Sequence, residues 1–251
     1  INNPHNPSGL VLSDSFLERI DNTCQSIHAT LIGDEHYRFL SDEKNQLGRT
    51  LYQSIKTETP VAKRQYCNFV TGSFIKCTGS PGLRIGWCVG PRPVLEIMQN
   101  EKNYTTHTVN PITEWISYEV LKNLNSLLWQ EVRSEWLQNK RILENFLKES
   151  NYFYGVSPQG GLVSCIGVKN LPVNISIENV NQLFLEHGIF LLPLSEMEFG
   201  SFSFQCENSY QNKKLSPLNK GFGFRLGLGI QTEKLKQMLV TAEDLLKNLN
   251  Q

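Results

Sequence analysis

A short segment between residues 73 and 84 holds three side chains whose chemistry could bind and modify a small anionic ligand. It places the hydroxyl of Ser73, the amine of Lys76 and the guanidinium of Arg84 at fixed offsets around a turn. Taken alone, a lysine in a loop is usually only a solvated charge. Here glycines and a proline follow it and let the backbone come close to a ligand, and the arginine is suited to contact phosphate through two hydrogen bonds. The segment therefore predicts an amine beside a bound anion.

Three further segments carry polar side chains next to predicted turns or strands. Asn3-Pro4-His5-Asn6-Pro7-Ser8-Gly9 is a rigid turn ahead of a helix, and alone it is only a strong turn signal. Asp34 and Tyr37 follow an apolar strand, where an α/β sheet presents ligand-binding groups, although a single acid there is more often a cap. Arg225 is embedded in an apolar strand spaced by glycines, where a lone charge must be paired with something anionic.

Taken in order, these segments resemble the class I/II aminotransferases of fold type I, which depend on pyridoxal 5'-phosphate (PLP). The resemblance rests on Asn-Pro-His-Asn-Pro-Ser-Gly, then Asp-x-x-Tyr, then Ser-x-x-Lys followed by Pro-Gly-x-Arg-x-Gly, then an arginine in a late strand. It runs from residue 3 to residue 229, and the spacing around the lysine is its most specific part. It implies an α/β fold with a three-layer, mostly parallel sheet and a smaller C-terminal α/β domain.

The resemblance implies a cofactor role for several residues. Lys76 would form the Schiff base with the cofactor aldehyde, and Asp34 would face the pyridine nitrogen. A carboxylate there keeps the nitrogen protonated, so that the ring can accept electrons from the substrate Cα. Asn6 and Tyr37 match residues that hydrogen-bond the phenolic oxygen of the ring. Lys76, Asp34 and Tyr37 are therefore the candidate catalytic residues.

The remaining matches concern the phosphate and the substrate. Ser73 and Arg84 match residues that hold the phosphate, and Arg225 matches the arginine that binds the substrate α-carboxylate, with Asn6 also assigned to the substrate site. Once a substrate amine displaces Lys76, the freed amine could move a proton as general acid and base. The implied function is the transfer of an amino group from an amino acid to a 2-oxo acid.

The same residues would also serve other reactions of this fold type, so decarboxylation, elimination and cyclisation of an amino acid remain alternatives. A truncated, non-catalytic remnant that only binds is a further alternative. The sequence begins at Ile1-Asn2-Asn3-Pro4, which reads as the end of a strand. Family members begin earlier and include a phosphate-binding helix N-terminus. We therefore expect the chain alone to bind PLP weakly and to be poorly active.

Hydrophobic periodicity predicts the elements that position these residues. A helix capped by Ser13 precedes a short apolar strand at 30–33, and this strand region ends at Asp34. The further predicted elements are strands at 65–72 and 84–90, helices from 91 to 150 with Pro111 at a first helical position, a strand at 161–168, a helix at 177–187, a strand at 189–194, an irregular segment at 195–221, a strand at 222–228 and a helix at 232–249. This order predicts the end of a large PLP-binding domain over 1–145 and a small domain over 146–251.

Composition argues against several other classes of protein. Lys+Arg and Asp+Glu each number 24, and no long basic run is present, so nucleic acid is not expected as a partner. No apolar run is long enough to span a membrane. The six cysteines form no CxxC pair and the five histidines lie near none, so we expect reduced thiols and no metal site. The resemblance implies a homodimer, and we expect a cytoplasmic location.

Overall fold

The structure, a computed structural model, describes residues 1–41, 68–123, 127–197 and 223–249. The chain divides into two compact units, residues 1–136 with 159–162, and residues 137–158 with 163–251. Residue 145 lies within a helix that contributes to both units, so the domain boundary at 145 stays a prediction. None of the helices in the described ranges is long and apolar enough to cross a membrane.

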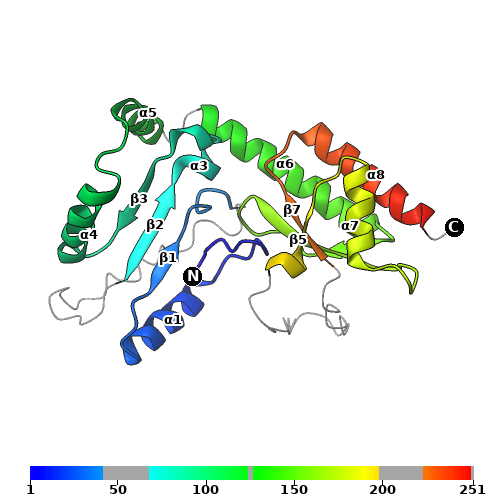
Figure 1. Ribbon diagram of the computed structural model, residues 1–251, viewed down its shortest axis with the longest axis horizontal. Coiled ribbons are helices and arrows are strands. Elements are labelled where there is room, and N and C mark those ends of the chain that lie inside the picture. Colours follow the sequence, from blue (N-terminus) through cyan, green and yellow to red (C-terminus); the bar gives the residue numbers. More distant parts are fainter. Residues whose placement is uncertain (42–67, 124–126, 198–222, 250–251) are drawn as a thin grey trace. The chain divides into compact units, whose positions relative to one another are not determined.

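The first unit contains a three-stranded sheet in the order β1-β2-β3 (Figure 1). Strand β1 (Ile32–Asp34) pairs in parallel with β2 (Phe69–Ser73), which pairs antiparallel with β3 (Gly86–Val89). These strands confirm the predictions at 30–33 and 84–90, and the prediction at 65–72 from residue 69 onward; residues 65–67 lie outside the described residues. Because β1 and β2 are parallel, their last residues lie at the same edge of the sheet.

Helix α1 (Asp14–Ser26) packs its apolar side against this sheet. The Ser13 hydroxyl accepts a hydrogen bond from the backbone N–H of Phe16 at 3.3 Å, which confirms the predicted cap. Apolar residues spaced three or four apart face the same side of a helix. The resulting cluster consists of Leu17, Leu31 and Val70, with Leu12, Ile20 and Cys24 packed against it. Burial of this cluster fixes α1 beside the strand that ends at Asp34.

Helices follow β2 and β3 in the first unit. A one-turn helix, α3 (Phe74–Cys77), begins directly after β2, and a 3-10 turn (Pro81–Leu83) precedes β3. Lys76 therefore lies on a helix, and the expectation of a loop was wrong, because four residues are too few for a visible helical period. The predicted helical region contains α4 (Arg92–Thr105), α5 (Pro111–Lys122) and α6 (Leu127–Glu149). Pro111 occupies the first turn of α5, as predicted.

The second unit contains a four-stranded antiparallel sheet in the order β4-β5-β7-β6. Its strands are β4 (Phe153–Gly155), β5 (Val163–Val168), β6 (Leu192–Pro193) and β7 (Gly223–Gly227). Its helices are α7 (Ile177–Glu186) and α8 (Thr232–Asn248), and a 3-10 turn covers Leu194–Met197. The predicted helices and three of the strands are confirmed, whereas β4 was not predicted. Most of the irregular segment, residues 198–221, lies outside the described residues.

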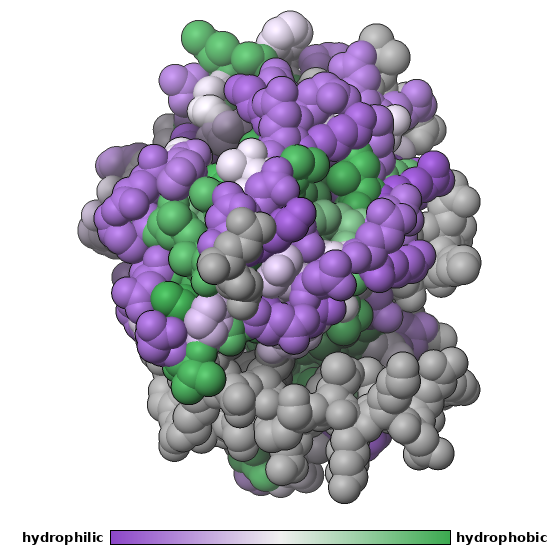
Figure 2. Space-filling view, turned by 90° about the vertical axis from the view of Figure 1, so that its right-hand side faces the viewer, coloured by the Kyte–Doolittle hydropathy of each residue, from purple (hydrophilic) through white to green (hydrophobic). Residues whose placement is uncertain are grey.

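The surface combines hydrophilic and apolar areas. On the face shown in Figure 2, hydrophilic residues predominate and hydrophobic residues form smaller areas between them. Large apolar side chains also remain exposed on α5, including Ile112 and Trp115 with exposed fractions of 68% and 64%. Exposed apolar side chains on one helix are typical of a surface that packs against another protein surface.

Candidate functional site

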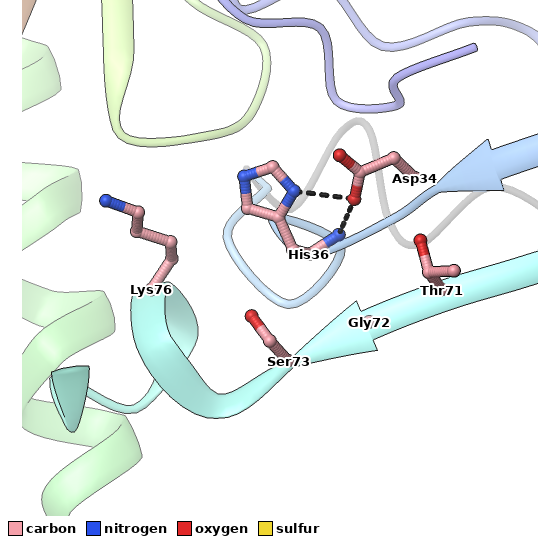
Figure 3. Close-up of a pocket in the computed structure, with 6 residues that line it drawn as sticks. All are labelled: Asp34, His36, Thr71, Gly72, Ser73 and Lys76. Atoms are coloured by element: carbon pink, nitrogen blue, oxygen red, sulfur yellow. Dashed lines mark hydrogen bonds and ion pairs between the residues drawn. The ribbon is translucent and has the colours of Figure 1, made fainter. Parts of the chain in front are cut away.

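A pocket of about 330 Å³ opens at the edge where β1 and β2 end (Figure 3). Its lining residues are Asp34, His36, Thr71, Gly72, Ser73 and Lys76. Small-molecule sites begin at roughly this volume. The structure thus brings together three residues that the sequence predicted for one site, Asp34, Ser73 and Lys76.

The end of β2 and helix α3 position two of these side chains. Ser73 is the last residue of β2 and has an extended backbone, with φ −154° and ψ 162°, so the helix starts immediately after it. Positions three residues apart lie on the same side of a helical turn. Lys76 is exposed, and Figure 3 shows its side chain rising from the helical turn that follows Ser73, so that both residues lie at the wall of the pocket. An amine and a hydroxyl are therefore available together to a ligand in the pocket.

The carboxylate of Asp34 is held from within its own turn. The Nδ1 atom of His36 lies 2.7 Å from Oδ1 of Asp34, and the backbone N–H of His36 donates to the same oxygen at 3.4 Å. The preceding backbone N–H, that of Glu35, donates to the carbonyl oxygen of Thr71 at 2.9 Å and joins this turn to β2. The sequence analysis missed His36, whose only signal was its place two residues after a candidate acid.

The Asn6 turn is attached to the end of β1 through Asn2. The backbone N–H of Asn6 donates to Oδ1 of Asn2 at 2.6 Å, and Nδ2 of Asn2 donates to the carbonyl oxygen of Asp34 at 3.0 Å. On its other side the turn meets residues 159–162, where the N–H of Gly160 donates to the carbonyl oxygen of Gly9 at 3.0 Å. The turn is thereby fixed beside the strand end that carries Asp34, although Asn6 does not line the pocket.

Tyr37 and Arg84 belong to the same unit but do not line the pocket either. Tyr37 is buried, and its ring centroid lies 4.0 Å from that of His36, so the tyrosine ring packs against the imidazole. Arg84 is exposed and has a left-handed backbone, φ 51°, at the end of the 3-10 turn. The roles assigned to both residues stay predictions.

Arg225 lies in the second unit, on β7, and is half-buried. Its backbone register places it opposite Cys165 on β5 and Leu192 on β6. Burial raises the pKa of the Cys165 thiol to about 11, and the positive charge of Arg225 acts in the opposite direction. Arg225 therefore brings a cation into a largely apolar sheet, as the sequence predicted, and its substrate role stays a prediction.

The side chains at the pocket match the functional groups of PLP. A carboxylate can pair with a protonated pyridine nitrogen, a primary amine can bond to an aldehyde, and hydroxyl and guanidinium groups can hold a phosphate. Asp34, Lys76 and Ser73 line the pocket and supply the carboxylate, the amine and the hydroxyl. Arg84, at the end of the following 3-10 turn, supplies the guanidinium. Within the described ranges, the structure contains no cluster of three or more His, Cys, Asp or Glu residues that could hold a metal ion.

Comparison with known proteins gives distant relatives in sequence. An uncharacterised HTH-type transcriptional regulator, YdfD of Bacillus subtilis (strain 168), is 30% identical over 234 residues, which are 90% of this chain and 45% of the regulator. Capreomycidine synthase of Streptomyces vinaceus is 20% identical over 227 residues, 89% of this chain and 55% of the synthase. The chain thus spans about half the length of these curated relatives.

Solved structures show the fold. The crystal structure of a PLP-dependent aminotransferase from Streptococcus suis 89-1591 matches with a TM-score of 0.77 and 20% identity, over 100% of this chain and 57% of that chain. This match confirms the predicted α/β fold of the fold type I kind. The sequence model described as aminotransferase class I and II matches residues 1–207, well over half of the 251 residues. The chain therefore belongs to the family of class I and II aminotransferases.

Proposed function

We propose that this protein is a PLP-dependent aminotransferase that moves an amino group from an amino acid to a 2-oxo acid, with Lys76 as the cofactor-binding lysine. The observation that carries the proposal is the single pocket shared by Asp34, Ser73 and Lys76. Membership of the aminotransferase family supports the same chemistry.

The described residues can each take one part in holding PLP. The cofactor supplies an electron sink for the charge left on the substrate Cα after its proton is removed. Asp34 would hold the proton on the pyridine nitrogen, and Ser73 and Arg84 would bind the phosphate. Asn6 and Tyr37 would orient the ring through its phenolic oxygen. Of these, Asp34 and Ser73 line the pocket, so they carry the strongest structural support.

The substrate would be held and deprotonated by two other residues. Arg225 would bind the α-carboxylate through parallel hydrogen bonds. Asn6 is the second residue that the resemblance assigns to the substrate. The amine of Lys76, once the substrate amine has taken its place, would accept the proton from Cα. The expectations of a homodimer and of a cytoplasmic location rest on the family resemblance, and both stay predictions.

A spectroscopic titration tests the proposal. PLP added to the purified protein should give a visible absorption band, which should change when an amino acid is added and return when a 2-oxo acid follows. Lys76→Ala should give no such band, whereas Lys122→Ala, a change of an exposed lysine on α5, should behave as wild type. A band of equal strength in Lys76→Ala would contradict the assignment.

Two other functions have a specific observation in their favour. The similarity to capreomycidine synthase, whose name describes a synthesis and not an amino transfer, favours one of the alternative reactions of this fold type. Products formed from the amino acid without any 2-oxo acid acceptor would identify that case. The similarity to a transcriptional regulator favours a unit that binds but does not catalyse. Tight PLP binding without turnover of any amino acid would identify this second case.

A further inference from the structure

We propose that His36 is a positioning residue, which fixes the Asp34 carboxylate toward the pocket and is itself held by the helix that carries Lys76. The proposal rests on the proposed function, because it explains how Asp34 is oriented toward the ring nitrogen of PLP. None of the sequence motifs assigns a role to this histidine.

The first step is the pairing between the two side chains. Nδ1 of His36 lies 2.7 Å from Oδ1 of Asp34, and the backbone N–H of His36 reaches the same oxygen at 3.4 Å (Figure 3). An ionised carboxylate only accepts hydrogen bonds, so Nδ1 must carry a proton. Because both contacts use Oδ1, the second oxygen of Asp34 can face a ligand.

The second step is that Asp34 needs such support. Its side chain is 48% exposed, whereas that of His36 is only 22% exposed. A carboxylate with that exposure can rotate into solvent unless a partner restrains it. The imidazole of His36 is more buried and can donate a charge-assisted hydrogen bond to the carboxylate. Such a fixed donor holds the carboxylate in one orientation, which mobile water molecules would not do.

The third step is that His36 is fixed in turn. The thiol of Cys77 donates to the carbonyl oxygen of His36 at 3.0 Å, and the Tyr37 ring packs 4.0 Å from the imidazole, centroid to centroid. Cys77 directly follows Lys76 in α3. This series of contacts links Asp34 at one side of the pocket to Lys76 at the other.

A measurement without cofactor tests the geometry. In the cofactor-free protein, the ¹⁵N chemical shifts of the neutral His36 ring should show the proton on Nδ1, and Asp34→Ala should remove that preference. A proton on Nε2 in the wild-type protein would overturn the proposal, whether or not the protein binds PLP.

A pair of substitutions tests the role at the cofactor. His36→Asn keeps an N–H donor at the position of Nδ1, whereas His36→Leu keeps a similar volume without a donor. In a PLP titration, His36→Leu should bind roughly tenfold more weakly and its visible band should shift, while His36→Asn should stay within about twofold of wild type. The thermal midpoint, measured for both variants, reports any general loss of structure.

The outcomes separate this proposal from the proposed function. Wild-type affinity and spectrum in His36→Leu would overturn the positioning role alone. An equal loss of affinity in both variants, accompanied by a lower thermal midpoint, would show a structural role and also overturn it. If the wild-type protein gives no band with PLP at all, the proposed function fails, and the positioning role fails with it.

Discussion

The thiol of Cys77 donates a hydrogen bond to the backbone carbonyl oxygen of His36 at 3.0 Å. This bond joins helix α3, which carries Lys76, to the turn that follows Asp34. Cys77 is 1% exposed, and burial raises the pKa of its thiol to about 12. The thiol therefore stays protonated, and remains a donor, throughout the neutral range.

The raised pKa of Cys77 predicts a loss of stability at high pH. The ordinary value is 9.0 and the folded value is about 12. Between these values the unfolded thiol ionises while the folded one keeps its proton, so the free energy of unfolding should fall as pH rises, by up to about 1.4 kcal/mol per pH unit. Below pH 9 the contribution is fully present. Urea unfolding at a series of pH values from 8 to 10.5 measures the slope.

Two substitutions of Cys77 provide the control. Cys77→Ser and Cys77→Ala both remove the titrating thiol, so both should flatten the slope, while only the serine keeps a donor for the His36 carbonyl. A residual slope is expected, because burial also raises the pKa of Cys165, to about 11. Unchanged slopes in both variants would show that Cys77 ionises equally in the folded and unfolded states.

A second prediction concerns the charge of Asp34. Asp34→Asn keeps the shape and an oxygen that can accept from His36, but removes the negative charge beside the pocket. PLP should still bind, while turnover should fall by about two to three orders of magnitude, the usual loss when developing charge is no longer stabilised. Asp14→Asn, a change of an exposed acid on α1, is the control. Wild-type turnover in Asp34→Asn would show that Asp34 faces something other than the ring nitrogen.

A third prediction concerns the close contact between residues 159–162 and the Asn6 turn. A Cβ at Gly160 would lie 2.8 Å from Cγ of Pro4 and 2.9 Å from the carbonyl oxygen of Leu40. Gly160→Ala should therefore destabilise the protein by about 1–3 kcal/mol and disturb the turn. Gly227→Ala, where a Cβ would meet nothing within 4 Å, should change stability by about 0.5 kcal/mol or less. Chemical denaturation compares the two, and equal stabilities would contradict the close packing.

The sequence predicted elements well where the local signal is strong. Ser13 and Pro111 mark helix starts through backbone chemistry that does not depend on distant contacts, and both predictions are confirmed. Helix α8 has seventeen residues, long enough for a clear helical period. The elements that failed are short: β4 has three residues and α3 has four, so neither shows a period.

The candidate site was predictable as a set of residues but not as an arrangement. The motif placed Asp34, Ser73 and Lys76 in order, and the parallel pairing of β1 with β2 then brings them to one edge. The pairing of His36 with Asp34 depends on the conformation of a turn after β1, which no periodicity encodes. The antiparallel pairing of the described strands β4 to β7 was equally absent from the sequence pattern, because it depends on contacts between distant strands.

The most direct test of the account is to locate the covalent bond between protein and cofactor. The protein is incubated with PLP, reduced with borohydride, digested and mapped by mass spectrometry. The account predicts the label on the peptide that contains Lys76, and none in Lys76→Ala. Label on another lysine, such as Lys63 or Lys102, would contradict the central claim that Lys76 holds the cofactor.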